Sequence, residues 1–318
     1  MKVFAYTEQY ADIWDGCVQR APMATFLHSR RYLSYHGDRF QDLSVLLEDQ
    51  TEGTLGLFPA AADPNDRKRV ISHPGITYGG LIHGRKLCGE QVIEAMRAVV
   101  EHYRQLGFAS LQYKAVPYIY HRAPCSDDLY ALFRLGATRC RCDLSCAIDL
   151  VNRPEPSRRR ERGFKKALKN GVEIERGARF AAELWPILEE NLERKYQTQP
   201  VHSLGEIIAL QSSFPDRIEC IVARVGSKVV AGVVLFLTQQ VTHMQYAASS
   251  PEGHAICALD AILSHSIAAA QNRGVRYFDF GISNEKNGRY LNGSLYQFKA
   301  EFGGGGVVHE FFEIPLQP

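Results

Sequence analysis

The sequence predicts a mixed α/β protein built from two similar domains in tandem. Segments with helical spacing of apolar residues alternate with short runs typical of strands. Two of the glycines that end these helical segments recur at one offset. Gly274 follows Gly107 by 167 residues, and Gly303 follows Gly136 by the same 167 residues. A stretch interrupted by two prolines, 152–157, separates the two halves.

Composition excludes several classes of protein. The chain has 318 residues, of which 45% are hydrophobic and 23% charged, so we expect two folded domains and no disordered, collagen-like or coiled-coil chain. The net charge of +2 gives no reason to expect a DNA partner, and any nucleic-acid contact must come from a local patch. Eight cysteines are too sparse for a disulfide-stapled secreted domain.

Targeting signals are also not expected. The first residues lack the basic and then apolar pattern of a signal peptide. The most apolar stretch, 229–237, has nine residues and contains a glycine, whereas a membrane-spanning helix needs roughly 20. We therefore expect a cytoplasmic protein without a membrane span.

The elements of the first half follow from periodicity and from turn residues. Apolar residues recur at three and four between 90 and 106, which predicts a helix that ends at Gly107. A second, shorter helix is predicted to end at Gly136. The predicted strands are 43–48, 54–61, 108–116 and 137–150, with a polar loop at 63–69.

The second half repeats this pattern. Its predicted helices, 258–272 and 291–302, end at Gly274 and Gly303. Its predicted strands are 218–225, 228–238, 241–248, 275–281 and 307–314. We place the domain boundary at 152/153, which gives domains 1–152 and 153–318.

This order of elements resembles the Gcn5-related N-acetyltransferase (GNAT) fold used twice, with a cleft. A tandem of that kind resembles the FemABX family of acyl- and aminoacyltransferases. The basic segment 158–172 is similar to the one that opens the family's second domain, and Phe298-Lys299 with Phe302-Gly303 is similar to its C-terminal motif. The stretch 277–283 also fits. The resemblance implies a catalytic second domain and a first domain that binds the acceptor or is degenerate.

The donor loop is the first candidate site. In simple acetyltransferases, backbone N–H groups of an Arg/Gln-x-x-Gly-x-Gly/Ala loop hold the donor's pyrophosphate at a helix start. Here Gly253 and Ala255 fit, but Ser250 replaces the Arg or Gln and Glu252 adds a negative charge. This favours aminoacyl-tRNA, the donor that the family resemblance implies, while acyl-CoA stays open. The alternative is an ordinary helix start that contains a glycine.

The basic segment 153–169 is the strongest charge feature. It carries eight cations and two anions, so the remainder of the chain is net −4. A basic stripe on an acidic body predicts phosphate binding, to a tRNA acceptor end, CoA or a nucleotide sugar. Arg162, Lys166 and Lys169 share one face if the segment is helical. The alternative is a solvated helix face. The predicted phosphate-binding residues are Arg158, Arg159, Lys166 and Lys169.

Candidate catalytic groups come from the last helix and the strand before it. Asn292, Tyr296 and Lys299 form one stripe, in which Lys299 can stabilise an oxyanion, Tyr296 can act as an acid and Asn292 can hold the donor. The FemABX resemblance also points to Lys299. The alternative is a set of surface polar residues.

Asp279 lies on a strand among aromatic residues, where an unpaired carboxylate is costly. It serves as a base, binds the acceptor amine, or satisfies loop N–H groups near Ser283 and Asn284, which are themselves candidate substrate ligands. Tyr246 is a candidate for stacking on the donor, with a core tyrosine as the alternative.

The first half supplies candidate acceptor ligands. Tyr78 lies in a glycine-rich segment, Lys114 lies on the next strand, and His28 precedes an early helix. For His28, a capping or buried histidine is the favoured interpretation. Cys140, Cys142 and Cys146 lack a second pair at zinc spacing, so we expect core thiols and no metal.

The leading hypothesis is an N-acyltransferase without a tightly bound cofactor. Its co-substrate is aminoacyl-tRNA or acyl-CoA, and its acceptor is an amine of a cell-envelope precursor, nucleotide sugar or other small molecule. The alternative is a catalytically silent tandem protein that binds RNA or nucleotide sugars, because the first half carries no donor signature.

Overall fold

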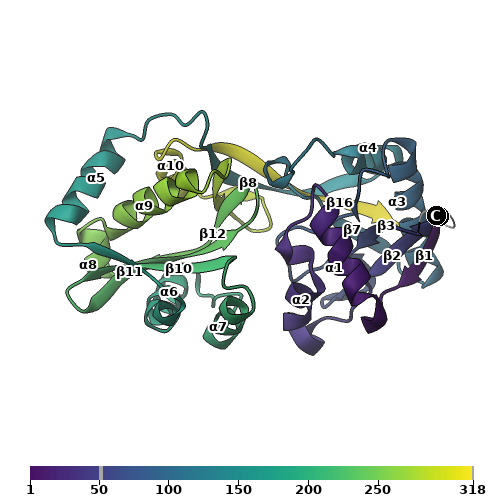
Figure 1. The fold of residues 1–318 in the computed structure, drawn as a ribbon, viewed down its shortest axis with the longest axis horizontal. Helices are drawn as coiled ribbons and strands as arrows, with labels where there is room; N and C mark the ends of the chain where they lie inside the picture. Colours follow the sequence, from purple (N-terminus) through teal and green to yellow (C-terminus); the bar gives the residue numbers. More distant parts are fainter. Residues whose placement is uncertain (50–52, 317–318) are drawn as a thin grey trace. The chain divides into compact units, whose positions relative to one another are not determined.

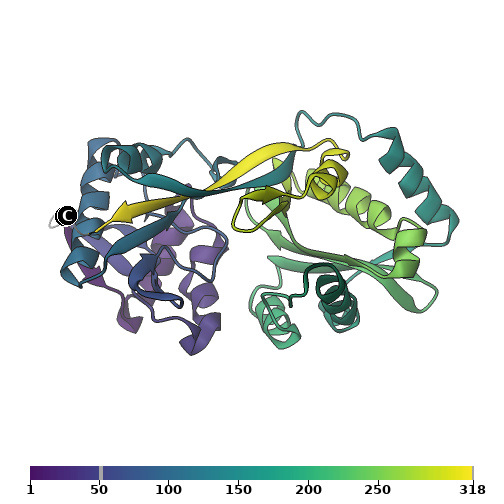
Figure 2. The same cartoon turned by 180° about the vertical axis from the view of Figure 1, so that it is seen from behind.

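The computed structural model describes residues 1–49 and 53–316, which fold into two compact units (Figures 1 and 2). Unit 1 comprises Met1–Leu144, Asn284–Tyr290 and Val308–Pro318, and unit 2 comprises Ser145–Ser283 and Leu291–Val307. The division is therefore not the single cut at 152/153 that the sequence predicts, because two short pieces of the second half belong to unit 1.

Unit 1 holds two groups of strands with helices packed on them. β1 (Lys2–Ala5), β2 (Val45–Asp49), β3 (Gly53–Phe58) and β6 (Ile82–His83) form an antiparallel sheet. β4 (Ala61–Asp63), β5 (Asp66–Ile71) and β7 (Ser110–Lys114) pair side by side. The helices are α1 (Ala11–Arg20), α2 (Arg30–Leu33), α3 (Glu90–Gln105) and α4 (Asp127–Arg134).

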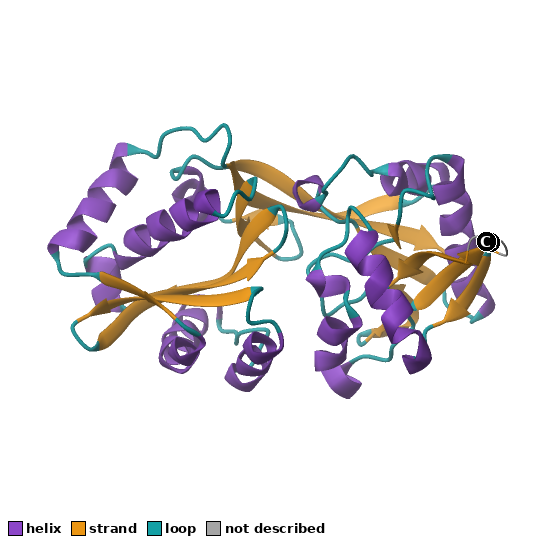
Figure 3. Ribbon diagram, viewed as in Figure 1, coloured by secondary structure: helices purple, strands orange, loops and turns teal. Residues whose placement is uncertain are grey.

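Unit 2 is a sheet with helices on both faces. Its strands include β9 (Glu173–Arg176), β10 (Ile218–Val225), β11 (Lys228–Leu237), β12 (Val241–Ser249) and β13 (Tyr277–Ile282). Its helices are α5 (Arg158–Lys169), α6 (Ala181–Tyr196), α7 (Leu204–Ser213), α8 (Pro251–Ala255), α9 (Ala258–Asn272) and α10 (Gly293–Ala300). Figure 3 shows α9 on one face of the sheet and α6 with α7 on the other. α5 packs against α9.

The glycine stops are confirmed. Gly107, Gly136, Gly274 and Gly303 have φ values of 85°, 69°, 72° and 96°. L-residues with a side chain rarely adopt this left-handed region, so glycine ends each helix at low cost. α9 has the predicted bounds, and α3 differs from its prediction only at its last residue.

The last strand of each half contributes to the sheet of the other unit. β8 (Thr138–Asp149) begins in unit 1, but its residues 147–149 pair with β13 in unit 2. β16 (Gly305–Pro315) begins in unit 2, but its residues 311–315 pair with β7 in unit 1. Both strands exist as predicted. The sequence prediction kept each within its own half, and the pairing shows that they are exchanged.

Other elements differ from the sequence prediction. The polar loop predicted at 63–69 is largely the hairpin of β4 and β5. The buried carboxylate of Asp63 pairs with Arg69 in this hairpin. Composition alone suggests a loop here, because it does not show that the charged residues pair. α6 and α7 were not predicted at all. No helix in residues 1–49 and 53–316 is long and apolar enough to cross a membrane.

Candidate functional site

A buried carboxylate and a histidine meet where two strands of unit 2 part. β12 and β13 run parallel and pair only from Val241 to His243, with His243 opposite Asp279. The Nδ1 atom of His243 lies 2.9 Å from Oδ2 of Asp279. The pairing ends at this register, so the pair occupies the point of divergence of the two strands.

Asp279 is fully buried, and hydrogen-bond donors surround its carboxylate. Ser145 on β8 donates its hydroxyl to Oδ1, and the Gly281 amide donates to the same oxygen over 3.0 Å. The Gly281 amide lies on β13 and not in the loop at Ser283 and Asn284, so these contacts leave the three roles considered for Asp279 as predictions. Such donors stabilise a buried carboxylate and fix its orientation toward His243.

Sequence reasoning did not select His243. Its position beside Asp279 depends on which residues of two parallel strands are opposite, and no local pattern carries that information. A signal existed only in combination: a histidine on the predicted strand 241–248 and an aspartate on the next predicted strand, 275–281.

Lys299 contacts the end of β13, the strand that carries Asp279. Its ammonium group, on α10, donates to the carbonyls of Gly281 and Ile282 over 2.8 and 2.7 Å. The side chain is buried, and burial lowers the pKa of Lys299 to about 8, although the charge of Asp279 acts in the opposite direction. The oxyanion role of Lys299 stays a prediction. Its two hydrogen bonds hold the end of the strand that carries Asp279.

Two residues of the predicted stripe on the last helix, Asn292 and Tyr296, have different structural surroundings. Asn292 caps α10, because its Oδ1 accepts from the Leu295 amide over 3.1 Å and from the Ser294 hydroxyl over 3.0 Å. Tyr296 is partly buried against the core of unit 2, and burial raises the pKa of its hydroxyl. Spacing alone therefore did not reveal that Asn292 is the N-terminal cap, after which the helix begins.

A cavity of about 530 Å³ lies in unit 2 beside the β12–α9 connection. Its walls come from α5, the end of α6, the α8 segment and α10. The lining contains five cations and one carboxylate: Arg159, Arg160, Arg162, Lys166, Lys195 and Asp260. This excess of positive charge within one concave site favours an anionic ligand.

Arg160 fixes one wall of this cationic pocket. The guanidinium is nearly buried and pairs with Asp260 over 3.0 Å and with Glu301 over 2.9 Å. It also stacks over the Phe298 ring at 4.7 Å. Burial raises the pKa of Asp260, and Arg160 opposes that rise. Two carboxylates therefore occupy Arg160. Arg159 also lies 3.8 Å from Glu301, and Arg162 donates to the Arg158 carbonyl over 3.2 Å, so within the described residues the ammonium groups of Lys166 and Lys195 are the cations left for a ligand.

The loop predicted to hold the donor forms α8 and its cap. Ser250 accepts from the Gly253 amide over 3.1 Å. A Cβ at Gly253 would lie 2.3 Å from the Val230 carbonyl oxygen, so only glycine fits against β11. Glu252 does not line the pocket and pairs with Lys228 over 2.6 Å. Its negative charge, which the sequence placed where a phosphate would bind, is thus held by Lys228.

Some of the predicted phosphate ligands line the cationic pocket and others do not. Arg159, Lys166 and Gly253 line the cationic pocket, whereas Arg158 and Lys169 do not. The segment is helical as required, and Ser157 caps it. Lys195, from α6, was missed because no sequence pattern brings α6 to α5.

Tyr246 is held by neighbours on α6 and in the segment between α6 and α7. Its hydroxyl lies 2.6 Å from Nδ1 of His202, and its ring meets Trp185 edge to face at 5.3 Å. It does not line the cationic pocket. The contacts fit the core alternative for Tyr246 and give no sign of donor stacking.

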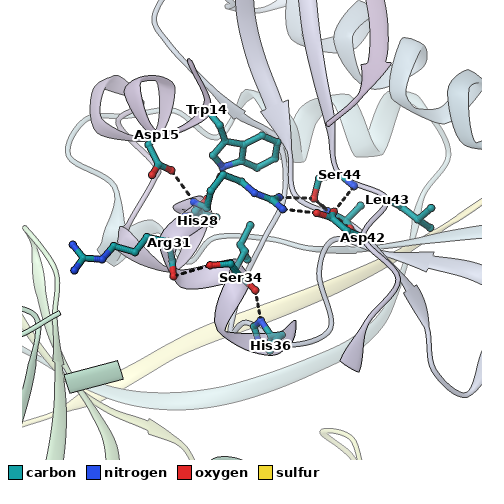
Figure 4. Close-up of polar contacts among 12 residues, drawn as sticks. Trp14, Asp15, His28, Arg31, Ser34, His36, Asp42, Leu43 and Ser44 are labelled. Atoms are coloured by element: carbon teal, nitrogen blue, oxygen red, sulfur yellow. Dashed lines mark hydrogen bonds and ion pairs between the residues drawn. The ribbon is translucent and has the colours of Figure 1, made fainter. Parts of the chain in front are cut away.

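The predicted acceptor ligands of the first half lie in the interior of unit 1. His28 is fully buried and accepts from the Thr25 amide over 3.0 Å, and burial lowers the pKa of His28 to about 4. Figure 4 shows the Trp14 indole, which donates to the His28 carbonyl over 2.7 Å. Tyr78 donates to the Thr25 hydroxyl over 3.3 Å, with its ring 5.7 Å from that of His28. His28 is the capping histidine that the sequence favoured.

Lys114 is also internal. Its ammonium donates to the backbone carbonyls of His73, over 3.2 Å, and Ile76. Burial lowers the pKa of Lys114 to about 7. Its contacts support the glycine-rich segment that follows β5, and none of them places Lys114 in a cavity.

Ser283 and Asn284 hold the chain near the end of β13. The Ser283 carbonyl accepts from the Asn292 amide over 2.9 Å, and its side chain is buried. Asn284 accepts from the Leu144 amide and donates to the Gly288 carbonyl over 3.3 Å. These contacts are structural, and the predicted substrate role of both residues stays a prediction.

The cysteines do not all lie in a core. Cys146 is buried, but Cys140 is exposed, so the expectation of core thiols is wrong for Cys140. Within residues 1–49 and 53–316, no group of three or more histidine, cysteine or acidic side chains has the arrangement of a metal site.

Comparison with known proteins supports the predicted fold. Residues 156–297 match the sequence profile described as "Acetyltransferase (GNAT) domain". The crystal structure of FemX superposes with a TM-score of 0.70 at 11% identity, covering 99% of this chain and 97% of FemX. L-PGS from Bacillus licheniformis gives 0.62 at 12% identity, with 96% and 92% covered.

A tandem GNAT protein from the clavulanic acid biosynthesis pathway gives a TM-score of 0.52 at 12% identity, covering 100% of this chain and 99% of that one. No curated protein matches the chain. The chain has the tandem acetyltransferase fold, and the predicted resemblance to the FemABX type of fold is confirmed.

Proposed function

We propose that the protein is an N-acyltransferase that moves an acyl or aminoacyl group from a phosphate-bearing donor onto the amine of a small acceptor. The observation that carries this proposal is the cationic pocket at the β12–α9 connection, inside the segment that matches an acetyltransferase domain. Within the described residues, the ammonium groups of Lys166 and Lys195 make no hydrogen bond or ion pair, so their charges are available to a phosphate.

The donor must have an extended arm. Ser249 lines the cationic pocket and His243 lies six residues earlier on the same strand, a span of about 20 Å at the usual rise per residue. A donor with phosphate in the pocket and its acyl carbon at His243 needs a linear arm of that length. The phosphopantetheine arm of acyl-CoA and the acceptor end of aminoacyl-tRNA both supply one.

The proposed chemistry assigns the base to His243 and its orientation to Asp279. When Nδ1–H of His243 donates its hydrogen bond to the carboxylate, Nε2 is the basic nitrogen. The acceptor amine attacks the donor's carbonyl carbon, and Nε2 takes the proton that the nitrogen loses. The tetrahedral intermediate then expels the ester or thioester leaving group, which takes a proton from Tyr296, our proposed acid. The proton held on Nε2 of His243 is returned through solvent to the Tyr296 oxygen, so both side chains regain their starting state.

Ligand binding with turnover tests this function. We expect CoA, acetyl-CoA or aminoacyl-tRNA at 100 times its dissociation constant to stabilise the protein by about 2.7 kcal/mol in thermal unfolding. Lys166→Ala should weaken that ligand about tenfold, because one phosphate contact is lost. Lys165→Ala is the matched control, since Lys165 is on the same helix but does not line the pocket.

The outcomes separate the hypotheses. Stabilisation by aminoacyl-tRNA alone assigns the donor that the FemABX resemblance implies, and stabilisation by CoA assigns an acyl-CoA enzyme. Binding without any transfer to a panel of primary amines contradicts the enzyme and favours the silent binding protein. Equal effects of the two lysine variants contradict the assignment of the pocket.

A further inference from the structure

Unit 1 contains a second cavity of about 810 Å³, formed by residues distant in sequence. The β4–β5 hairpin, β7, β8, the β14–β15 hairpin (Asn284–Glu285 and Tyr290–Leu291) and β16 contribute to its walls. Its size is in the range of small-molecule sites. None of the groups assigned above to acyl transfer lines it, so its ligand is a separate question.

The charged side chains in this cavity fall into a paired set and an unpaired set. Arg69 is bound by Asp63, with Nε 2.7 Å from Oδ2. Arg141 is bound by Asp143, with its terminal nitrogen 2.7 Å from Oδ2. Both carboxylates are buried, so these two arginines are neutralised where they stand.

Three charged groups of the cavity are left over. Within the described residues, the carboxylate of Glu313 makes no hydrogen bond or ion pair, and neither does the guanidinium of Arg289. The Lys286 ammonium contacts only the Tyr290 ring, 5.9 Å from its centroid. One concave surface thus offers an open carboxylate together with open cations.

The segment that carries the two open cations is firmly held. Lys286 and Asn287 have φ values of 51° and 53°, an uncommon backbone for residues with side chains. The Asn287 side chain accepts from Arg141 over 3.3 Å. A Cβ at Gly288 would lie 2.6 Å from the Cys142 carbonyl oxygen, so the turn packs directly on β8. The cations therefore project from a fixed support.

We infer that this cavity binds a small zwitterion, whose ammonium group pairs with Glu313 and whose carboxylate pairs with Arg289 and Lys286. Arginine binds a carboxylate with two parallel hydrogen bonds, and an isolated carboxylate is a natural partner for an ammonium ion. A simple anion pairs only with the two cations and a simple amine pairs only with Glu313, whereas a zwitterion pairs with all three groups. The matching chemistry is that of a free amino acid or of a short peptide.

Calorimetric titration of the full-length protein tests this inference without any acyl donor. The probes are the common L-amino acids and the dipeptide Ala-Ala, each beside its N-acetyl and its C-amide derivative. We expect at least one zwitterion to bind, and both derivatives of it to bind at least tenfold more weakly. A preference for the amino acid or for the dipeptide tells which source the site takes.

Two variants and a matched control localise the site. Glu313→Gln should weaken the zwitterion at least tenfold and leave its N-acetyl derivative, which has no ammonium group, unaffected. Arg289→Gln should weaken the zwitterion as well. Glu310→Gln is the control, because Glu310 lies on the same strand, pairs with Arg139 and does not line the cavity.

The inference is overturned if no zwitterion binds at millimolar concentration, if the N-acetyl derivatives bind as well as their parents, or if Glu313→Gln behaves like Glu310→Gln. None of these results bears on donor binding in unit 2. Failure here is therefore distinct from failure of the proposed acyl transfer.

Discussion

At the scale of single residues, the carboxylate of Asp279 organises the candidate active site through three donors on different elements. Ser145, Gly281 and His243 all converge on it, and Lys299 holds the Gly281 carbonyl from the opposite side. The carboxylate has no exposed surface. In the reaction that we propose, its effect is exerted through His243, the ring that it contacts.

Replacement of Asp279 by Asn should lower kcat by roughly 100-fold to 10,000-fold, the range that a general base contributes. The amide no longer selects the His243 tautomer in which Nε2 is basic. The KM for the donor should change little, because Asp279 does not line the cationic pocket. Steady-state kinetics with the donor identified by binding provide the measurement.

Ser145→Ala is the matched control for that experiment. It removes a different hydrogen bond from the same buried carboxylate and keeps the His243 contact, so kcat should fall less than tenfold. If the two variants lose equal activity, with folding verified by circular dichroism, the role of His243 as base is refuted.

Residue chemistry was partly predictable from the sequence. Lys166, Arg159 and Gly253 were selected and do line one pocket, because charge clusters and glycine loops are local features. His243 and Lys195 were not selected, because their neighbours are set by strand register and by helix packing. Tyr78 was selected for chemistry, but the structure buries it, since a polar residue in a sequence carries no mark of its depth. His28 was a candidate as well, although the sequence favoured a capping or buried histidine there, and His28 is buried.

At the scale of elements, the contact between α5 and α9 depends on one glycine. A Cβ at Gly163 would lie 2.4 Å from Oδ1 of Asp260. Asp260 is short, nearly buried and held by Arg160, so it has little room to retreat. Any side chain at position 163 therefore pushes α5 away from α9.

Gly163→Ala should destabilise unit 2 by about 1–3 kcal/mol, as expected for overpacking of a filled contact. Gly205→Ala should do the reverse and stabilise by up to about 1 kcal/mol, because alanine favours helices and its Cβ on α7 has open space. Urea denaturation of the two variants gives the comparison. Equal effects at both glycines would show that α5 yields without strain.

Helices were predicted best where periodicity and a glycine stop coincide, as in α3 and α9. α6 was missed although it is long, because Pro186 lies inside it and its apolar residues were not read as one face. The β4–β5 hairpin was missed because its strands carry charged residues, which balance one another only after folding. Local signals define such elements poorly when partners far along the chain stabilise them.

At the scale of the whole molecule, the exchange of β8 and β16 makes each unit depend on residues from the other half of the sequence. Ile314 and Leu316 belong to the core of unit 1, together with residues of α3. Cys146 and Ile148 belong to the core of unit 2. The repeat in the sequence therefore identified two similar halves correctly but not the boundaries of the folded units.

Removal of residues 311–318 should selectively destabilise unit 1, because β7 loses its partner and the core loses two buried side chains. Hydrogen exchange followed by mass spectrometry should show faster exchange in α3 and β7, with α9 still protected. Removal of residues 317–318 alone is the control. Uniform loss of protection in both units would mean that they unfold as one cooperative body.

The exchange of β16 also sets an order of events during protein synthesis. The ribosome delivers the N-terminal residues first, but the edge of β7 is paired only by residues 311–315. Nearly the whole chain must therefore emerge before unit 1 is complete, while β7 exposes an unpaired edge in the meantime. A stop in translation before residue 311 would therefore leave unit 1 without the strand that pairs with β7, although most of unit 1 is synthesised first.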